Sequence, residues 1–470
     1  MRLRAINSFQ NAQTVGRGVL TAPQTSPPHG SLGQRALPLL AVAVLFFIGT
    51  VGASAESLLL SNAIVHTVSG ETLTHGQVLI NGNKIQAVGT NLTQSANKVV
   101  DLNGQHLYPG LIALDSALGL TEIEAVRSTR DMAEVGDYRP DVQSWIAVNP
   151  DSELLPVSRA NGIAHAEPAP QGGVMGGLSG VIALDGWTTE QMTIKRPAAF
   201  HVYWPEMTLD TKPKEKFKDQ SKYKSLEDQA KERTAKINAL DDFFHEAHAY
   251  AKERDAIKKN GTPDPGINPP WEAMLPVVRG EIPIMVHAEE FRQIKAALRW
   301  AQTNQYKIVL VGGNEAWMAV DVLSSSKVPV IFENVFKQPT HDWDAYDVHF
   351  RTPELLRRAG VKVAFSEGAD SFNAALTKNL PYSAAQAVAF GLPEEEAIKG
   401  MTLYPAQLLN MADRLGSIEP GKEATLFVAD GSILDIRANV KQMWIAGKEV
   451  SLESRHTRLY EKYKNRPRTK

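Results

Sequence analysis

The sequence contains no cysteine, so neither disulfide bonds nor thiolate metal ligands are available to this protein. Its charges almost cancel, because 50 lysine and arginine residues face 52 aspartate and glutamate residues, for a formal net charge of -2. This balance leaves no global field to attract nucleic acid or acidic membranes, so we expect no nucleic-acid partner. The pattern G-x-S-x-G is also missing, which argues against the serine nucleophile of an α/β-hydrolase.

What is present is enough apolar material for a large core. The chain has 470 residues, and 43% of them are hydrophobic, which excludes wholesale disorder. That length exceeds one ordinary domain and suits a barrel with a smaller partner domain.

The N-terminal segment has the pattern of an export signal. Scattered arginines precede an apolar run at 36–49, and Ala53-Ser54-Ala55 follows as an A-x-A cleavage pattern. We predict that residues 1–55 are a signal peptide or an uncleaved N-terminal anchor, since the run approaches the length of a membrane span. Either alternative exports the rest of the chain, to the periplasm in a Gram-negative cell, and only the anchor would contact the membrane.

Short strand patterns occur near both ends of the remaining chain. Residues 57–68 and 77–88 are rich in β-branched and aliphatic residues, with Asn81-Gly82-Asn83 as turn residues in the second segment. The same pattern returns at 424–429 and 440–445. We therefore predict one small β-sandwich composed of residues 56–108 and 416–455.

The long middle of the chain, residues 109–415, alternates apolar strands with helical segments. This alternation predicts an α/β fold of the TIM-like (β/α)8 barrel type. The candidate strands are residues 163–167, 180–184, 282–287, 307–311, 328–332 and 361–365. The number of strands between 184 and 282 stays open.

One segment departs from a compact barrel. Residues 206–262 include a stretch dense in lysine, glutamate, aspartate and alanine, with Phe243, Phe244 and Tyr250 at helical spacing. Because its lysines are interleaved with acids, we interpret it as a solvated helical insert rather than a nucleic-acid surface. We leave open whether this insert covers the mouth of the barrel.

Three segments carry a resemblance to the amidohydrolase superfamily. Residues 108–119 (YPGLIALDSALG) resemble the first barrel strand of that family, where P-G-L-I-D-x-H-x-H ends in two metal-binding histidines. Residues 81–89 (NGNKIQAVG) and 416–428 (GSIEPGKEATLFV) resemble its terminal β segments. Other segments, such as 149–153 (NPDSE), are similar to the exported, imidazolonepropionase-like group.

The resemblance implies a metal site with several substituted positions. In the family, strand one supplies both histidines, strands five and six one histidine each, and strand eight an aspartate. Here Asp115 and Ala117 replace the first two, Gly312 and Gly313 stand in strand six, and His287 fits strand five. No lysine lies in a plausible fourth strand, so a bridged two-metal centre is not expected.

Three residues remain as candidate ligands: Asp115, His287 and Asp370. They would hold one divalent ion (zinc, iron or manganese) weakly, or the protein binds no metal. Asp370 or Glu367 would take the proton from the attacking water. The alternatives are a buried structural role for His287 and a helix N-cap role for Asp370.

Two further groups are candidates for substrate binding. His165 and Glu167 lie two apart on a candidate strand, so they share a face, and a glycine-rich loop follows at 171–177. This loop lacks the lysine and serine of a nucleotide-binding loop, and a plain turn is its alternative. His341 and His349 fall in a polar segment that is expected at the barrel mouth or simply solvated.

Three functions follow from these patterns. The first is a hydrolase that uses metal-activated water on a carbon–nitrogen bond other than a main-chain peptide bond, such as a cyclic amide. The second is a catalytically inactive descendant that binds a small molecule in the periplasm. The third is a membrane-tethered scaffold that uses the charged insert. The sequence does not settle the oligomeric state.

Overall fold

The computed structural model describes residues 57–261, 266–333 and 335–467. The predicted signal peptide or anchor lies outside these residues. Among the described helices, none combines the length and the apolar character that a membrane crossing needs.

An eight-stranded sheet forms the centre of the molecule and nearly closes into the predicted TIM-like barrel. Its order is β13-β12-β11-β10-β9-β8-β7-β6, and Ser366 Oγ of β13 donates to the carbonyl of Leu114 in β6 at 2.9 Å across the seam. The strands are β6 (Leu111–Ser116), β7 (Ile163–Pro168), β8 (Met175–Ala183), β9 (Thr193–Tyr203), β10 (Ile284–Ala288), β11 (Ile308–Gly312), β12 (Val330–Glu333) and β13 (Val363–Ser366).

One part of the barrel is irregular. β8 runs antiparallel to both β7 and β9, whereas all other neighbouring pairs are parallel. The chain therefore passes from β7 to β9 through a meander in which α2 (Thr189–Met192) is the only helix among these described residues. β9 is the strand that the sequence left unresolved between 184 and 282.

The barrel interior is filled by alternate side chains, as the two-residue period of a strand requires. Ile112, Met285, Val309 and Ile331 belong to one apolar cluster, which α10 (Leu403–Leu408) joins from below through residues such as Ala406. The polar side chains at the C-terminal ends of the strands lie above this apolar layer, and we call them the polar floor.

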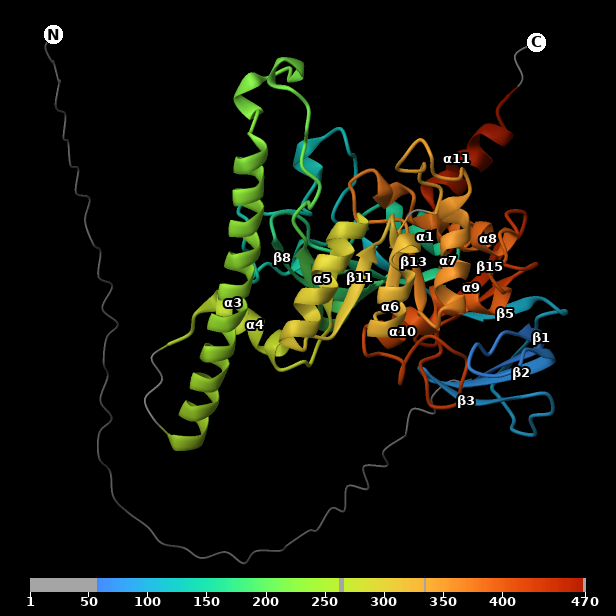
Figure 1. Cartoon of the computed structure of the whole chain (residues 1–470). Helices are drawn as coiled ribbons and strands as arrows, with labels where there is room; N and C mark the ends of the chain where they lie inside the picture. Colours follow the sequence, from blue (N-terminus) through green and yellow to red (C-terminus); the bar gives the residue numbers. More distant parts are fainter. Residues whose placement is uncertain (1–56, 262–265, 334, 468–470) are drawn as a thin grey trace, which may run out of the picture. The chain divides into compact units, whose positions relative to one another are not determined.

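Helices surround the sheet in the order that the connections dictate (Figure 1). They are α1 (Leu154–Arg159), α4 (Pro269–Val278), α5 (Phe291–Asn304), α6 (Val320–Ser326), α7 (Val348–Arg358), α8 (Leu380–Ala389) and α9 (Glu394–Met401). The apolar stripe of α5, including Ile294, Ala297 and Leu298, is buried in the main core. A terminal helix, α11 (Arg455–Lys464), has no buried residue.

Strands from both ends of the described chain pair in a second sheet. Its order is β16-β15-β14-β5-β1-β2-β3, with β4 beside β1, and the junction is the antiparallel pair β14 and β5. The strands are β1 (Ser57–Val65), β2 (Leu73–Asn81), β3 (Lys84–Gly89), β4 (Lys98–Asp101), β5 (His106–Pro109), β14 (Leu426–Ala429), β15 (Val440–Ile445) and β16 (Lys448–Glu449). One apolar core, which includes Leu60, Ile80, Leu107 and Trp444, joins both ends.

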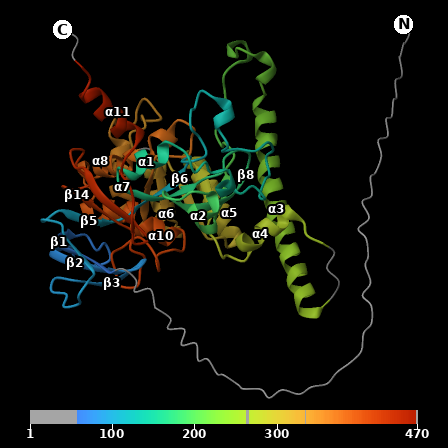
Figure 2. The same cartoon turned by 180° about the vertical axis from the view of Figure 1, so that it is seen from behind.

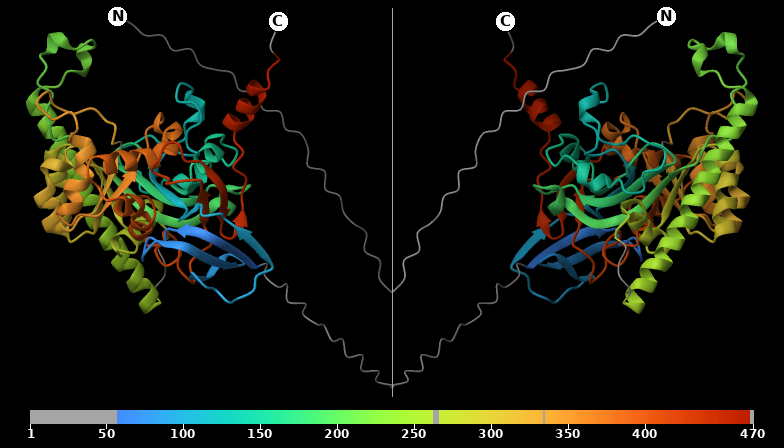
Figure 3. Two further views of the ribbon diagram at one scale, coloured as in Figure 1. Left: turned by 90° about the vertical axis from the view of Figure 1, so that its right-hand side faces the viewer. Right: turned by 90° about the vertical axis from the view of Figure 1, so that its left-hand side faces the viewer.

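The charged insert forms α3 (Leu226–Asn260), a helix of 35 residues on the side of the barrel away from β1–β3 (Figures 1 and 2). Ser225 caps its start by accepting from the Asp228 N–H, and Gly261 ends it in the left-handed conformation. The middle of the helix is anchored to the barrel: Phe244 is buried against Trp300 and Tyr306, and Trp300 Nε1 donates to Asp241 at 2.6 Å. Figure 3 shows the helix extending beyond the barrel at both ends.

Candidate active site

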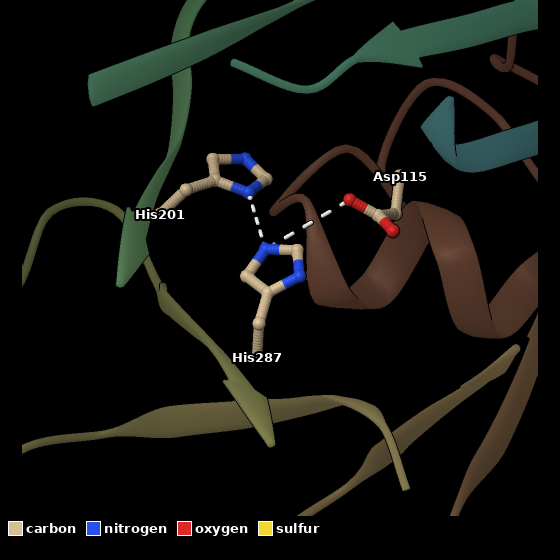
Figure 4. Close-up of side chains that lie close together, drawn as sticks. All are labelled: Asp115, His201 and His287. Atoms are coloured by element: carbon tan, nitrogen blue, oxygen red, sulfur yellow. Dashed lines mark hydrogen bonds and ion pairs between the residues drawn. The ribbon is translucent and has the colours of Figure 1, made fainter. Parts of the chain in front are cut away.

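Three potential metal ligands converge at the C-terminal ends of the barrel strands. Asp115 of β6, His201 of β9 and His287 of β10 each direct one ligand atom into a region where these atoms lie within 4.8 Å of one another. His201 Nδ1 is 3.0 Å from His287 Nε2, and His287 Nε2 is 3.8 Å from Asp115 Oδ1. Figure 4 shows both rings and the carboxylate pointing toward one another.

A strained backbone positions the aspartate. Asp115 has a φ of +43°, a conformation that L-residues rarely adopt, and the register between β6 and β7 shifts beside it. Its N–H donates to Glu167 Oε2 at 3.0 Å, which holds the peptide in this conformation. Asp115 thereby turns into the barrel instead of continuing the regular alternation of the strand.

Glu167 organises the polar floor of the barrel. It is fully buried, and besides the Asp115 N–H it accepts from Ser179 Oγ at 2.5 Å and lies 3.0 Å from His201 Nε2. Because a carboxylate only accepts, His201 must carry its proton on Nε2, which leaves Nδ1 with a lone pair directed at His287. A carboxylate that orients a metal-binding histidine in this way is a common feature of protein metal sites.

The residues present fit one divalent cation. Asp115 Oδ1 is buried and has no hydrogen-bond partner among the described residues, although such atoms are normally satisfied. Two imidazole nitrogens and a carboxylate are also a usual donor set for zinc. The separations of 3.0 and 3.8 Å bracket the roughly 3.3 Å between ligands of a tetrahedral ion with bonds of about 2.0 Å.

The ionisation of the cluster is compatible with ligand chemistry. Burial, followed by the neighbouring His201, lowers the pKa of His287 well below its usual range, so His287 is neutral. The pKa of Asp115 is raised to about 6, mainly by burial, and the hydrogen bond with Glu333 acts in the opposite direction. Burial and then the Asp115 charge raise the pKa of Glu333 well above its ordinary value. Burial thus disfavours the ionised form of both neighbouring carboxyl groups, and the Asp115 charge adds to this effect at Glu333.

A cavity of about 420 Å³ opens above this floor. His287 forms part of its wall and stacks on Tyr203, with ring centroids 4.0 Å apart. Other lining residues are Asp115, Gln171, Gly172, Gly173, Trp204, Glu206, Glu289, Glu333 and Asp370. The cavity is thus bounded by the strand ends on one side and by the predicted glycine-rich loop on another.

The structure also shows what occupies the strand-six position. Gly312 has a φ of +91°, and a Cβ built on it would lie 2.9 Å from the Glu289 carboxylate. Glu289 Oε2 accepts from the Asn314 N–H at 2.9 Å, and Oε1 lies 3.3 Å from Lys337 Nζ. Glu289 therefore fills the space in which a side chain at position 312 would lie. At the substituted position of strand one, Ala117 is fully buried.

Some of the residues predicted from the sequence meet in this cavity and others do not. Asp115, His287 and Asp370 line it, and Glu167 lies beneath it. Glu367 does not line it, because its buried carboxylate accepts from Ser383 Oγ at 2.5 Å.

The three remaining predicted histidines also lie outside the cavity lining. His165 is buried in β7, where it pairs in register with Ile112 of the apolar layer below the floor. His341 lies in a mouth loop, 3.0 Å from Glu315 and stacked on Trp343. His349 is buried on α7.

Sequence reasoning missed His201 and Glu333. His201 lies in the middle of the apolar run AAFHVYW (198–204). Glu333 ends the run VPVIFE (328–333), which resembles the placement of His287 in IPIMVHA. The early Pro197 weakens the first run as a strand signal. The fourth strand of the barrel also contains a lysine, contrary to the prediction, but Lys195 Nζ donates to the Leu409 carbonyl at 2.6 Å, below the barrel floor.

Comparisons with known proteins agree with the fold. The model of the amidohydrolase family matches residues 350–450. The solved structure of an amidohydrolase from Thermotoga maritima is similar over 84% of this chain and 99% of its own, with 26% identity and a TM-score of 0.72.

Two curated relatives match shorter segments. An imidazolonepropionase from Mesorhizobium japonicum is 35% identical over 77 residues, which are 16% of this chain and 19% of the relative. The amidohydrolase tasK from Hapsidospora irregularis is 23% identical over 184 residues, 38% of this chain and 18% of the relative. The chain thus matches about a fifth of the length of each.

An eight-stranded barrel with its polar cluster at the C-terminal strand ends is the arrangement in which TIM-barrel enzymes build their active sites. Together with the family match over residues 350–450 and the extended structural similarity, it supports the assignment of the chain to the amidohydrolase superfamily.

Proposed function

We propose that this protein is a metal-dependent hydrolase that cleaves a carbon–nitrogen bond other than a main-chain peptide bond, in a small molecule such as a cyclic amide. The observation that carries the proposal is the buried Asp115–His201–His287 cluster, with an unpartnered carboxylate oxygen, beside a 420 Å³ cavity. Two of the similar proteins are named as amidohydrolases, which favours catalysis over a purely binding role.

Asp115, His201 and His287 would hold the ion. A divalent cation such as zinc, iron or manganese supplies Lewis acidity there, polarising a carbonyl group and lowering the pKa of water. Glu167 orients His201 by holding its Nε2 proton, and Tyr203 fixes the plane of His287 by stacking.

Asp370 is the residue that we assign to proton transfer. It lines the cavity from the loop that follows β13 and remains accessible, so its carboxylate can take a proton from the attacking water and pass it to the leaving nitrogen. Glu367, the other predicted base, is bound to Ser383 outside the cavity, so we do not assign it this role.

We further propose that the protein acts outside the cytoplasm, in the periplasm of a Gram-negative cell. This part of the proposal is supported by the basic, apolar and A-x-A pattern within residues 1–55.

The test compares metal content and turnover in wild type, His201→Ala and His245→Ala. His245 is an exposed histidine on α3 and serves as the matched control. Each protein is assayed with cyclic amides and N-acyl amino acids. We expect wild type and His245→Ala to bind about one ion and turn over at least one substrate, and His201→Ala to lose both. Equal metal content and turnover in all three proteins would refute the proposed site.

A further inference from the structure

A second cavity, of about 360 Å³, lies directly beside the proposed catalytic cavity. The two share Gly173, Tyr203, Trp204 and Glu206 as lining residues, so one wall belongs to both. We call it the outer cavity. A ligand whose reacting bond lies over the metal cluster can extend its remote end into it.

Helix α3 provides the far wall of the outer cavity through Gln229, Glu232, Arg233 and Lys236. These residues lie on successive turns of the helix and face the barrel. Two contacts fix them: Tyr138 Oη donates to the Lys236 carbonyl at 2.9 Å, and Arg233 Nη1 donates to the Met207 carbonyl at 2.7 Å. The charged insert is therefore part of a defined pocket and not only a solvated excursion.

Most polar groups on this wall are already paired. Glu232 bonds to Lys224 and lies 3.9 Å from Lys236, and Lys236 also lies 3.6 Å from Asp137. The Gln229 amide bonds to the carbonyls of Asp210 and Lys224 and to the Asp210 N–H.

Arg233 differs from these groups. Its one hydrogen bond among the described residues goes to a neutral carbonyl, and it has no carboxylate partner there. A guanidinium has five N–H donors in a planar arrangement that matches a carboxylate, so most of its donors remain available.

The shared wall carries two further polar groups that lack a partner among the described residues. Gly173 lines both cavities with a φ of +65°, and its N–H makes no hydrogen bond to any described residue. Glu206 on the same wall is exposed and also lacks a partner among the described residues. Its negative charge disfavours an anion at the junction, so an anionic group belongs deeper in the outer cavity, toward α3.

We propose that the outer cavity binds a carboxylate at the remote end of the substrate and that Arg233 determines this specificity. The substrates would be amides that carry a carboxylate, such as N-acyl amino acids, with the carbon–nitrogen bond in the catalytic cavity. The inference rests on the proposed function and narrows its substrate class.

The test is binding of a matched pair of probes to the full-length protein. N-acetyl-L-phenylalanine carries the carboxylate, and N-acetyl-L-phenylalaninamide replaces it with a neutral amide. Dissociation constants are measured by equilibrium dialysis for wild type, Arg233→Gln, Arg233→Lys and the control Lys231→Gln. Lys231 lies two residues away on α3 and makes an exposed pair with Glu227, so its substitution removes the same charge outside the cavity.

We expect wild type and Lys231→Gln to bind the acid at least tenfold more tightly than the amide. Arg233→Gln should lose this preference while its affinity for the amide is unchanged, and Arg233→Lys should retain part of it. Equal affinity of wild type for both probes, no binding of the acid, or the same loss in Lys231→Gln would overturn the proposal.

Chromatography of the same samples for phenylalanine and acetate separates this inference from the proposed function. Arg233-dependent binding without hydrolysis of any amide would support the carboxylate site and count against the hydrolase. Hydrolysis with binding that is independent of Arg233 would support the hydrolase and overturn the carboxylate site.

Discussion

Replacing Glu167 with glutamine tests how the metal cluster is organised. The carboxylate accepts at both oxygens: Oε1 from Ser179 and His201, and Oε2 from the Asp115 N–H. Glutamine has nearly the same shape, but one of its two ends is an NH₂ donor. No orientation of the amide therefore reproduces all three bonds.

The two orientations have different consequences. If the NH₂ group faces the Asp115 N–H, two donors meet and a buried hydrogen bond is lost, which costs about 1–3 kcal/mol of the free energy of unfolding. If it faces His201 Nε2, that nitrogen must accept, and the ring proton moves to Nδ1, the atom that faces His287. Either change disturbs a ligand, and loss of such an orienting carboxylate lowers metal affinity by about 10- to 100-fold.

The assay is competition for zinc against a chromogenic chelator, with thermal unfolding measured on the same samples. Glu354→Gln is the matched control, because Glu354 is a buried glutamate that pairs with Arg357 and Arg358 on α7, outside the site. We expect Glu354→Gln to lose stability but keep its zinc affinity, and Glu167→Gln to lose both. Wild-type zinc affinity in Glu167→Gln would show that the cluster does not depend on Glu167.

Two further predictions concern stability. Burial raises the pKa of Glu367 to about 7 from an ordinary 4.5, so its ionised form opposes folding and stability falls as pH rises between these values. Glu367→Gln can still accept from Ser383. Its free energy of unfolding should match that of wild type at pH 4 and exceed it by up to about 3 kcal/mol at pH 8. Unfolding curves that show the same difference at both pH values would contradict this prediction. Phe244→Ala should lower the free energy of unfolding by about 3–5 kcal/mol, because Phe244 anchors α3 against Trp300. The control Leu226→Ala, at the exposed start of the helix, should be nearly neutral in denaturant titrations. Equal effects of the two substitutions would mean that Phe244 does not anchor α3.

The sequence predicted the barrel because its strands are continuous apolar runs separated by amphipathic helices. The four later strands, β10 to β13, lie within two residues of the predicted ranges. The meander of β7, β8 and β9 was not predictable in this way, since the antiparallel direction of β8 arises from tertiary pairing and leaves no periodic signature.

The candidate site was predicted in part. His287 could be placed because it follows an apolar strand directly, and Asp115 because the strand-one frame survives around it. His201 was not placed, because Pro197 weakens its run as a strand signal and the sequence does not show that β9 lies beside β10 in the barrel. The role of Glu167 depends on contacts to residues 12, 34 and 52 positions away, which a single sequence does not record.

The substituted positions also have a structural account that the sequence alone did not supply. Ala117 is buried beyond the end of the strand, while Asp115 reaches the cluster through a positive φ that Glu167 stabilises. Glu289 fills the space beside Gly312. The candidate cluster thus keeps the predicted Asp115 and His287 and adds His201, which was not predicted.

The most direct test of the central claim is the metal content of the protein purified without chelator or added metal, measured beside His201→Ala. We predict about one zinc, iron or manganese ion per chain in the wild type and less than a tenth of that in the variant. A wild-type protein that contains no metal, and whose thermal stability does not rise when any of these ions is added, would contradict the account.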